Sequence, residues 1–160
     1  MAEQKRLGAI ENTRGDHQRT HMENTVGKGI CPFCELNTAL NKVIRSGMYW
    51  RMWPNPFAYP HQQHHFIIAT FAHRTNILEL GEAEWLELRT LLRKTINKFN
   101  IPGGAVVCRF GDLAYNAGTL AHLHVHIQVP DNTGPAMAVF GKIQSKDQEA
   151  LLVRAFTQKV

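Results

Sequence analysis

The sequence predicts one α+β domain, in which an antiparallel sheet is combined with one long helix and a C-terminal helix. Short runs rich in large apolar residues occur over 48–53, 66–70, 105–110 and 122–129, and each suits a strand. A single long amphipathic stretch separates the second run from the third. Three prolines interrupt the chain over 54–60, which therefore forms a loop. Strands arranged around one helix, without strict alternation of strand and helix, are typical of this fold class.

The composition is that of a globular protein with a single domain. The chain has 160 residues, of which 44% are hydrophobic and 19% charged. No apolar run approaches the roughly 20 residues that cross a bilayer, and the polar start lacks the apolar region of a secretory signal. Three cysteines, with only one close pair, do not form the disulfide framework of a secreted domain. We therefore expect a cytoplasmic protein without a membrane partner.

The charge balance favours an anionic ligand. The net charge is +5 and the sequence pI is about 9.3, which suits a nucleotide better than a cationic partner. The basic residues are spread along the chain and form no run like a nucleic-acid-binding tail.

Two regions of the chain differ in apolar periodicity. Residues 1–28 are mostly polar and show none, so we expect a flexible tail there and a globular domain over 29–160. The long helix is expected from residue 82 to about residue 100, where Pro102 follows. Shorter helices are expected over 35–44 and 146–156. The apolar side chains of the long helix recur every three or four residues, namely Trp85, Leu88, Leu92, Ile96 and Phe99.

The most informative segment alternates three histidines with aliphatic residues. His122, His124 and His126 share one face of an extended strand, while the aliphatic side chains between them enter the core. An amphipathic strand needs polar residues on one face, but it does not need three histidines. A neutral imidazole is a nucleophile near pH 7, and its neighbours could hold its tautomer, donate to phosphate oxygens or bind metal.

The turn before this strand has the features of a phosphate cradle. Glycines such as Gly111 and Gly118 let backbone amides approach an anion closely. The hydroxyl of Thr119 adds one more donor. Directly before three histidines that share a face, such a turn indicates phosphate binding.

A second cluster suits a metal. Cys31 and Cys34 have the CxxC spacing of zinc sites, and the thioredoxin-like context of a redox CxxC is absent. His73 and His122 are the favoured further ligands, and four protein ligands would make the zinc structural. Five other histidines compete as ligands. His17 and His21 lie in the polar tail. His61, His64 and His65 lie in or beside a polar loop, where solvent or substrate would surround them.

With these residues the chain resembles the histidine-triad (HIT) superfamily, in its zinc-bearing CxxC branch. The run 122–126 matches the family signature of three histidines separated by apolar residues, and 65–73 resembles the strand that leads to the zinc histidine. The resemblance covers about residues 30–130. It implies a homodimer and an antiparallel sheet of about five strands. It also implies four ligands for a structural zinc, namely Cys31, Cys34, His73 and His122.

The resemblance also implies a mechanism. The middle histidine, His124, would attack the α-phosphorus and form a nucleotidyl-imidazole intermediate, which water or another acceptor then resolves. His126 would contact the phosphate or assist departure of the leaving group. Thr119 and backbone donors near Gly118 would bind phosphate oxygens.

The substrate contacts depart from the family pattern. Asn55 stands nearest to the usual acidic ribose contact, in a run over 55–59 like that of diadenosine-polyphosphate phosphorylases. Trp53 and Phe57 could enclose a base, although aromatic residues next to a strand also pack into cores. Gly118 is expected at the phosphate.

These expectations favour a nucleotide hydrolase or nucleotidyltransferase. Its substrate would be a dinucleoside polyphosphate, a nucleoside phosphoramidate or a similar compound, cleaved at the α-phosphate. The alternative is a nucleotide-binding regulatory or interaction module with little turnover. A zinc-dependent nucleic-acid binder ranks third, because neither a basic helix nor an aromatic RNA platform is visible.

Overall fold

The computed structural model describes residues 6–34, 40–141, 147–148, 150–151 and 154. Five strands form one antiparallel sheet in the order β1-β2-β3-β5-β4. The strands are β1 (Arg45–Ser46), β2 (Trp50–Pro54), β3 (Gln62–Thr70), β4 (Ala105–Arg109) and β5 (His124–Pro130). This sheet confirms the predicted α+β fold class.

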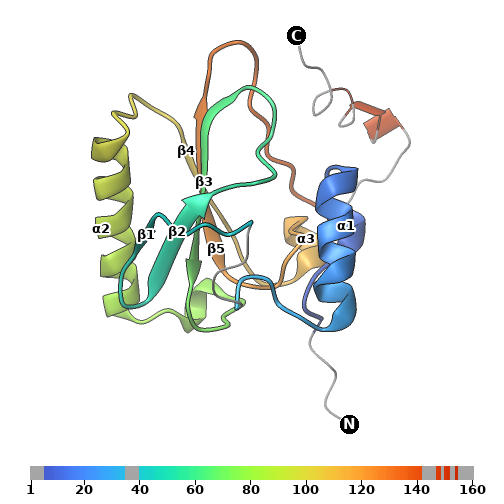
Figure 1. Ribbon diagram of the computed structural model, residues 1–160, viewed down its shortest axis with the longest axis horizontal. Helices are drawn as coiled ribbons and strands as arrows, with labels where there is room; N and C mark the ends of the chain where they lie inside the picture. Colours follow the sequence, from blue (N-terminus) through green and yellow to red (C-terminus); the bar gives the residue numbers. More distant parts are fainter. Residues whose placement is uncertain (1–5, 35–39, 142–146, 149, 152–153, 155–160) are drawn as a thin grey trace.

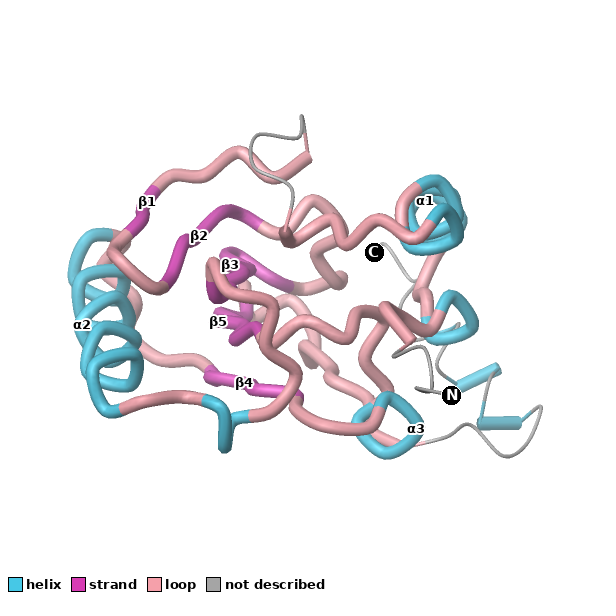
Figure 2. The backbone as a smooth tube through the Cα atoms, turned by 90° about the horizontal axis from the view of Figure 1, so that it is seen from below, coloured by secondary structure: helices cyan, strands magenta, loops and turns pink. Residues whose placement is uncertain are grey.

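The helices lie on opposite sides of the sheet. They are α1 (Asp16–Asn24), α2 (Glu82–Lys98) and α3 (Leu113–Asn116), with 3-10 turns at Ile10–Asn12, Val26–Lys28 and Ile77–Glu79. Figures 1 and 2 show α2 beside one side of the sheet, with α1 and α3 beyond the other. Among the described residues, no helix has both the length and the apolar character needed to span a bilayer.

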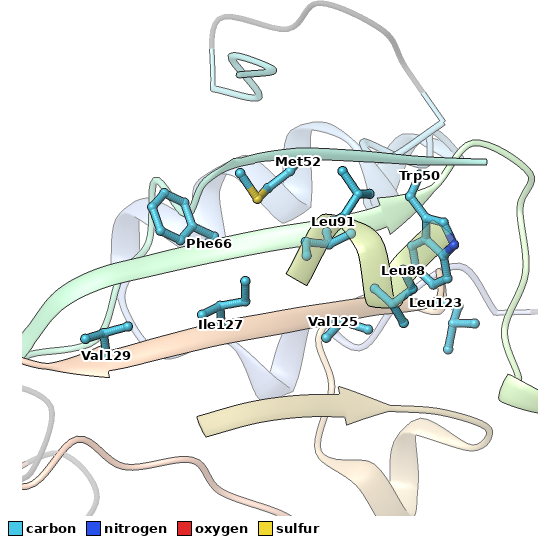
Figure 3. Packing of buried hydrophobic residues seen from close by; sticks show 10 residues of the cluster. Trp50, Met52, Phe66, Leu88, Leu91, Leu123, Val125, Ile127 and Val129 are labelled. Carbon is cyan, nitrogen blue, oxygen red and sulfur yellow. The ribbon is translucent and has the colours of Figure 1, made fainter. Parts of the chain in front are cut away.

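The core lies between α2 and the sheet. Leu88 and Leu91 of α2 are buried against strand residues such as Val125 and Ile127 (Figure 3). The predicted helix is confirmed, but two residues expected on its inner face are not buried: Trp85 is 45% exposed and Ile96 is 38% exposed.

Trp85 and Ile96 are exposed because α2 turns a different stripe of residues toward the sheet. Its buried positions are 84, 88, 91 and 95, which form one stripe along the helix. Glu84 occupies the position next to Trp50, whose indole Nε1–H donates to the Glu84 carbonyl oxygen at 2.8 Å. The Glu84 carboxylate also binds Arg74, with Nε 3.0 Å from Oε1. These polar contacts allow a charged residue to take an inner position.

The strand alternation confirms the predicted two-residue period. Val125 and Ile127 point to the core beneath α2, and His124 and His126 point to the opposite face. In the register of β3 and β5, His126 lies opposite Ile67 and His124 lies opposite Ala69. The strand begins at His124, so His122 lies just before it.

Other elements differ from the prediction. Of the helix expected over 35–44, residues 35–39 lie outside the described residues, and 40–44 form a turn and irregular chain. The C-terminal helix expected over 146–156 lies mostly outside the described residues, and its described members are helical: Asp147, Gln148, Ala150, Leu151 and Arg154. The short β1 and α3 have too few residues to show a period.

Residues 6–28, here called the N-terminal arm, contain α1 and run beside the chain before β5. Ala9 N–H donates to the Thr119 carbonyl at 2.9 Å, and Ala121 N–H donates to the Leu7 carbonyl at 2.8 Å. Met22 is the only buried residue of α1, which is why this helix has no apolar stripe in the sequence. The division between a flexible tail and a domain at residue 29 stays a prediction.

Candidate active site and metal site

Four side chains gather their donor atoms at one point on the histidine face of the sheet. The ligand atoms of Cys31, Cys34, His73 and His122 all lie within 4.8 Å of one another. Cys31 Sγ is 3.4 Å from His122 Nδ1, and Cys34 Sγ is 3.2 Å from His73 Nδ1. Tetrahedral zinc holds sulfur and nitrogen ligands about 3.5 Å apart, given its usual bond lengths. The four residues could therefore hold one metal ion.

The surroundings of the cluster suit such an ion. His122 Nε2–H donates to the Thr70 carbonyl oxygen at 2.9 Å, which leaves Nδ1 free to face the cysteines. Burial raises the pKa of the Cys31 thiol to about 12. A bound cation reverses this effect, because the thiolate is the ligand form. The guanidinium of Arg51, a buried residue, also interacts electrostatically with both cysteines.

The other histidines lie elsewhere. His17 and His21 of α1 contact the ring of Phe57, with centroids 5.5 Å and 5.6 Å away. His61 hydrogen-bonds Thr133, with 2.8 Å between Nδ1 and Oγ1. His64 stacks on Phe66, near the end of the core. None of them joins the group of ligand atoms found among the described residues.

His124 presents one ring nitrogen to a cavity. Its Nδ1–H donates to the carbonyl oxygen of His122 at 2.6 Å, because a carbonyl can only accept. The lone pair is therefore on Nε2, which has no hydrogen-bond partner among the described residues. The ring lines the cavity together with His126. Burial lowers the pKa of His124 to about 4.

His126 is hydrogen-bonded to His65 of β3. The amide of Asn55 has its oxygen on Phe57 N–H at 3.0 Å, so its NH₂ group faces the His65 ring, 3.2 Å from both Nδ1 and Nε2. His65 Nε2 lies 2.8 Å from His126 Nδ1, so one of these two rings donates to the other. The rings of His124 and His126 are adjacent, with centroids 4.8 Å apart.

His65 is a functional candidate whose place the sequence analysis missed. It was expected in or beside a loop, whereas it is buried in β3. The signal was the two-residue period of His65, Ile67 and Ala69, which continues the strand toward the loop. Asn55 lines the cavity, and its amide oxygen and nitrogen bond to Phe57 and His65.

The loop 117–120 forms another wall of the cavity. Ala117 has φ of 52°, and the Gly118 N–H donates to Asn116 Oδ1 at 2.7 Å. A Cβ at Gly118 would lie 2.8 Å from the same Oδ1, which explains the glycine. Thr119 lines the cavity, and its hydroxyl has no hydrogen-bond partner in the described part of the chain. Thr119 is therefore a better placed donor than the Gly118 amide.

The two aromatic candidates differ in position. Phe57 lines the cavity, beneath the two histidines of α1. Trp53 is fully buried and does not line it, because Phe33 covers the indole with centroids 5.0 Å apart. Trp53 packs with Ile67 and Ala69. It is therefore a core residue, and the expectation that it contacts a base is not met.

Two arginines that were not predicted from the sequence also line the cavity. Arg109 of β4 lies opposite His124 in the register with β5 and is 8% exposed. Arg14 comes from the N-terminal arm. Among the described residues, no aspartate or glutamate lines this cavity. The site therefore has the charge to receive an anion.

Comparison with known proteins gives matches among solved structures only: no protein-family model and no curated protein matches the chain. The histidine triad nucleotide-binding protein from Candida albicans is 13% identical, over 70% of this chain and 82% of that chain, with a TM-score of 0.50. A hypothetical histidine triad nucleotide-binding protein from Sulfolobus tokodaii is 22% identical, over 79% and 89%, with a TM-score of 0.48. A Zn-bound histidine triad family protein from Mycobacterium smegmatis is 14% identical, over 71% and 82%, with a TM-score of 0.45.

Proposed function

For a chain with the histidine-triad fold, we propose the function of a nucleotide hydrolase or nucleotidyltransferase. It cleaves a dinucleoside polyphosphate, a nucleoside phosphoramidate or a similar compound at the α-phosphate, through a nucleotidyl-His124 intermediate. The observation that carries the proposal is the pair of adjacent imidazoles in one cavity, of which His124 presents the lone pair of Nε2. In the proposed site His126 accepts from His65 at Nδ1 and presents an Nε2–H.

In the first step, His124 Nε2 attacks the α-phosphorus and forms a nitrogen–phosphorus bond. The bond from phosphorus to the leaving group breaks, and its electron pair stays on the leaving atom. His126 Nε2–H donates to that atom or to a phosphate oxygen. Thr119 lines the same cavity, and its hydroxyl donates to a non-bridging oxygen of the α-phosphate.

In the second step, an acceptor removes the nucleotidyl group. Water attacks the phosphorus, the nitrogen–phosphorus bond breaks, and the electron pair returns to His124 Nε2. Where His126 has given up its proton in the first step, it takes one from the water. An acceptor other than water would make the same two steps a transfer reaction.

We also propose that the metal is zinc, held by Cys31, Cys34, His73 and His122. With four protein ligands the zinc is structural and supplies no open position for chemistry. Its binding fixes the His122 ring, and the carbonyl of the same residue holds the tautomer of His124. The homodimer and the cytoplasmic location stay predictions.

Intact-mass analysis after brief mixing tests the proposed reaction. Diadenosine triphosphate and adenosine 5′-phosphoramidate would leave the same adenylyl group on the wild-type chain. We expect no adduct and no turnover with His124→Ala, while the fold and the metal content persist. His64→Ala is the matched control and keeps the adduct, because His64 lies outside the cavity. Binding of both compounds without adduct or turnover would contradict the enzyme and favour the regulatory module.

A further inference from the structure

Arg109 is a buried cation without an anionic partner among the described residues. Its Nη1 donates to the carbonyl oxygens of Asn116 at 3.1 Å and Ala117 at 2.9 Å. Its Nε is buried and has no partner in the described part of the chain. A buried charge with neutral partners only is costly, so this position favours an anionic ligand.

Arg14 brings a second positive charge to the same carbonyl. Its Nη2 donates to Ala117 O at 3.2 Å, and its Nε is also buried without a partner among the described residues. Two guanidinium groups on one carbonyl repel each other, and no carboxylate in the described lining of the cavity separates them. One α-phosphate at His124 does not account for two such cations.

A second cavity begins where Arg14 lies. It has a volume of about 770 Å³ and shares Asn12, Arg14 and Ala117 with the cavity of His124. Ligand sites commonly measure about 300–1,000 Å³. This second cavity is therefore large enough for a group that is attached to the phosphates on the side away from His124.

We infer that Arg14 and Arg109 form a subsite for the leaving group, which binds the phosphate next to the α-phosphate, and that the second cavity receives what is attached to it. This inference rests on the proposed attack by His124. When the bond between the α-phosphorus and the bridging oxygen breaks, the electron pair moves onto that oxygen. The two guanidinium groups bind the resulting phosphate anion.

Two substrates with one nucleotidyl group and different leaving groups test the subsite. Diadenosine triphosphate loses a phosphate-bearing group, whereas adenosine 5′-phosphoramidate loses an amine. Arg14→Gln should lower kcat/KM for diadenosine triphosphate about 10- to 100-fold, the effect of a lost charged hydrogen bond. Its effect on the phosphoramidate should be less than about threefold. Arg19→Gln, on the exposed side of the same arm, is the matched control and changes neither value.

A competition experiment on the wild-type chain needs no variant and covers the case in which Arg14→Gln does not fold. Inorganic tripolyphosphate should slow adduct formation at concentrations at which orthophosphate has no effect. Equal losses for both substrates in Arg14→Gln, or equal inhibition by both anions, would overturn the subsite and leave the proposed reaction intact. Absence of an adduct with either substrate would overturn the proposed reaction itself.

Discussion

His124 donates its Nδ1–H to the backbone carbonyl of His122 at 2.6 Å, so two residues of the triad are joined through the main chain. The His122 ring belongs to the metal cluster, and its carbonyl selects the tautomer of His124. The metal cluster and the candidate nucleophile are thus linked by a single residue. Because the acceptor is a main-chain oxygen, the position of the His122 backbone sets the orientation of the His124 ring.

We first predict a graded effect of the two cavity histidines. His126→Gln should slow adduct formation about 10²- to 10⁴-fold, the usual contribution of general acid–base catalysis, and leave the mass of the adduct unchanged. His124→Ala should abolish the adduct. Rapid-quench mass spectrometry measures both. An adduct that persists in His124→Ala would show that another residue is the nucleophile.

We next predict that removal of one metal ligand destabilises the whole domain. Cys34→Ser should lower the zinc content below one ion per chain. A zinc ion at a thousandfold excess over its dissociation constant contributes about 4 kcal/mol to the free energy of unfolding, and the variant loses most of this. Metal analysis and urea denaturation are the measurements. Cys108→Ser is the control, because Cys108 is not among the four clustered residues; equal zinc loss in both would refute the ligand set.

The third prediction concerns pH. Burial lowers the pKa of His65 from 6.5 to about 4. As pH falls from 6.5 to 4, the unfolded chain takes up a proton that the folded chain does not. The free energy of unfolding therefore falls over this window, with His65 contributing on the order of 3 kcal/mol.

His65→Gln should show a smaller loss of stability between pH 6.5 and 4 than the wild type. Urea denaturation at several pH values and a fixed zinc concentration gives both slopes, and contributions from the metal and from histidines that do not interact with His65 cancel in the comparison. His64→Gln, at the adjacent residue, is the control and should keep the wild-type dependence of the free energy of unfolding on pH. Identical slopes for wild type and His65→Gln would contradict a buried neutral His65.

The fourth prediction tests which side of α2 faces the core, by making the same Leu→Ala substitution on two sides of the helix. Leu88→Ala should lower the free energy of unfolding by about 2–5 kcal/mol, because Leu88 is 5% exposed and packs in the core. Leu86→Ala should stay within about 0.5 kcal/mol, because Leu86 is 60% exposed. Similar losses at both positions would mean that α2 packs in a different orientation.

The parts of the site that depend on local spacing could be predicted from the sequence. The CxxC pair and the alternating histidines are neighbours in the chain, and a strand or a tight turn places such neighbours together. His73 was selected for the metal cluster from several competing histidines, and its ring does lie there.

The parts that depend on distant contacts could not be predicted. Arg109 and Arg14 meet at one carbonyl although 95 residues separate them, and no period in the sequence relates them. His65 is brought beside His126 only through the register of β3 with β5. Trp53 and Trp85 show the reverse problem, since aromatic character alone does not tell which side of an element faces the core.

The position of the N-terminal arm has a kinetic consequence. Asn12 Nδ2 donates to the Gly118 carbonyl at 2.8 Å, and together with the backbone pairs of the arm this holds it against the loop 117–120. The space beside His124 measures about 60 Å³, well below the 300 Å³ or more of common ligand sites. The proposed reaction therefore requires the N-terminal arm to move away from the loop 117–120 before a nucleoside can reach His124.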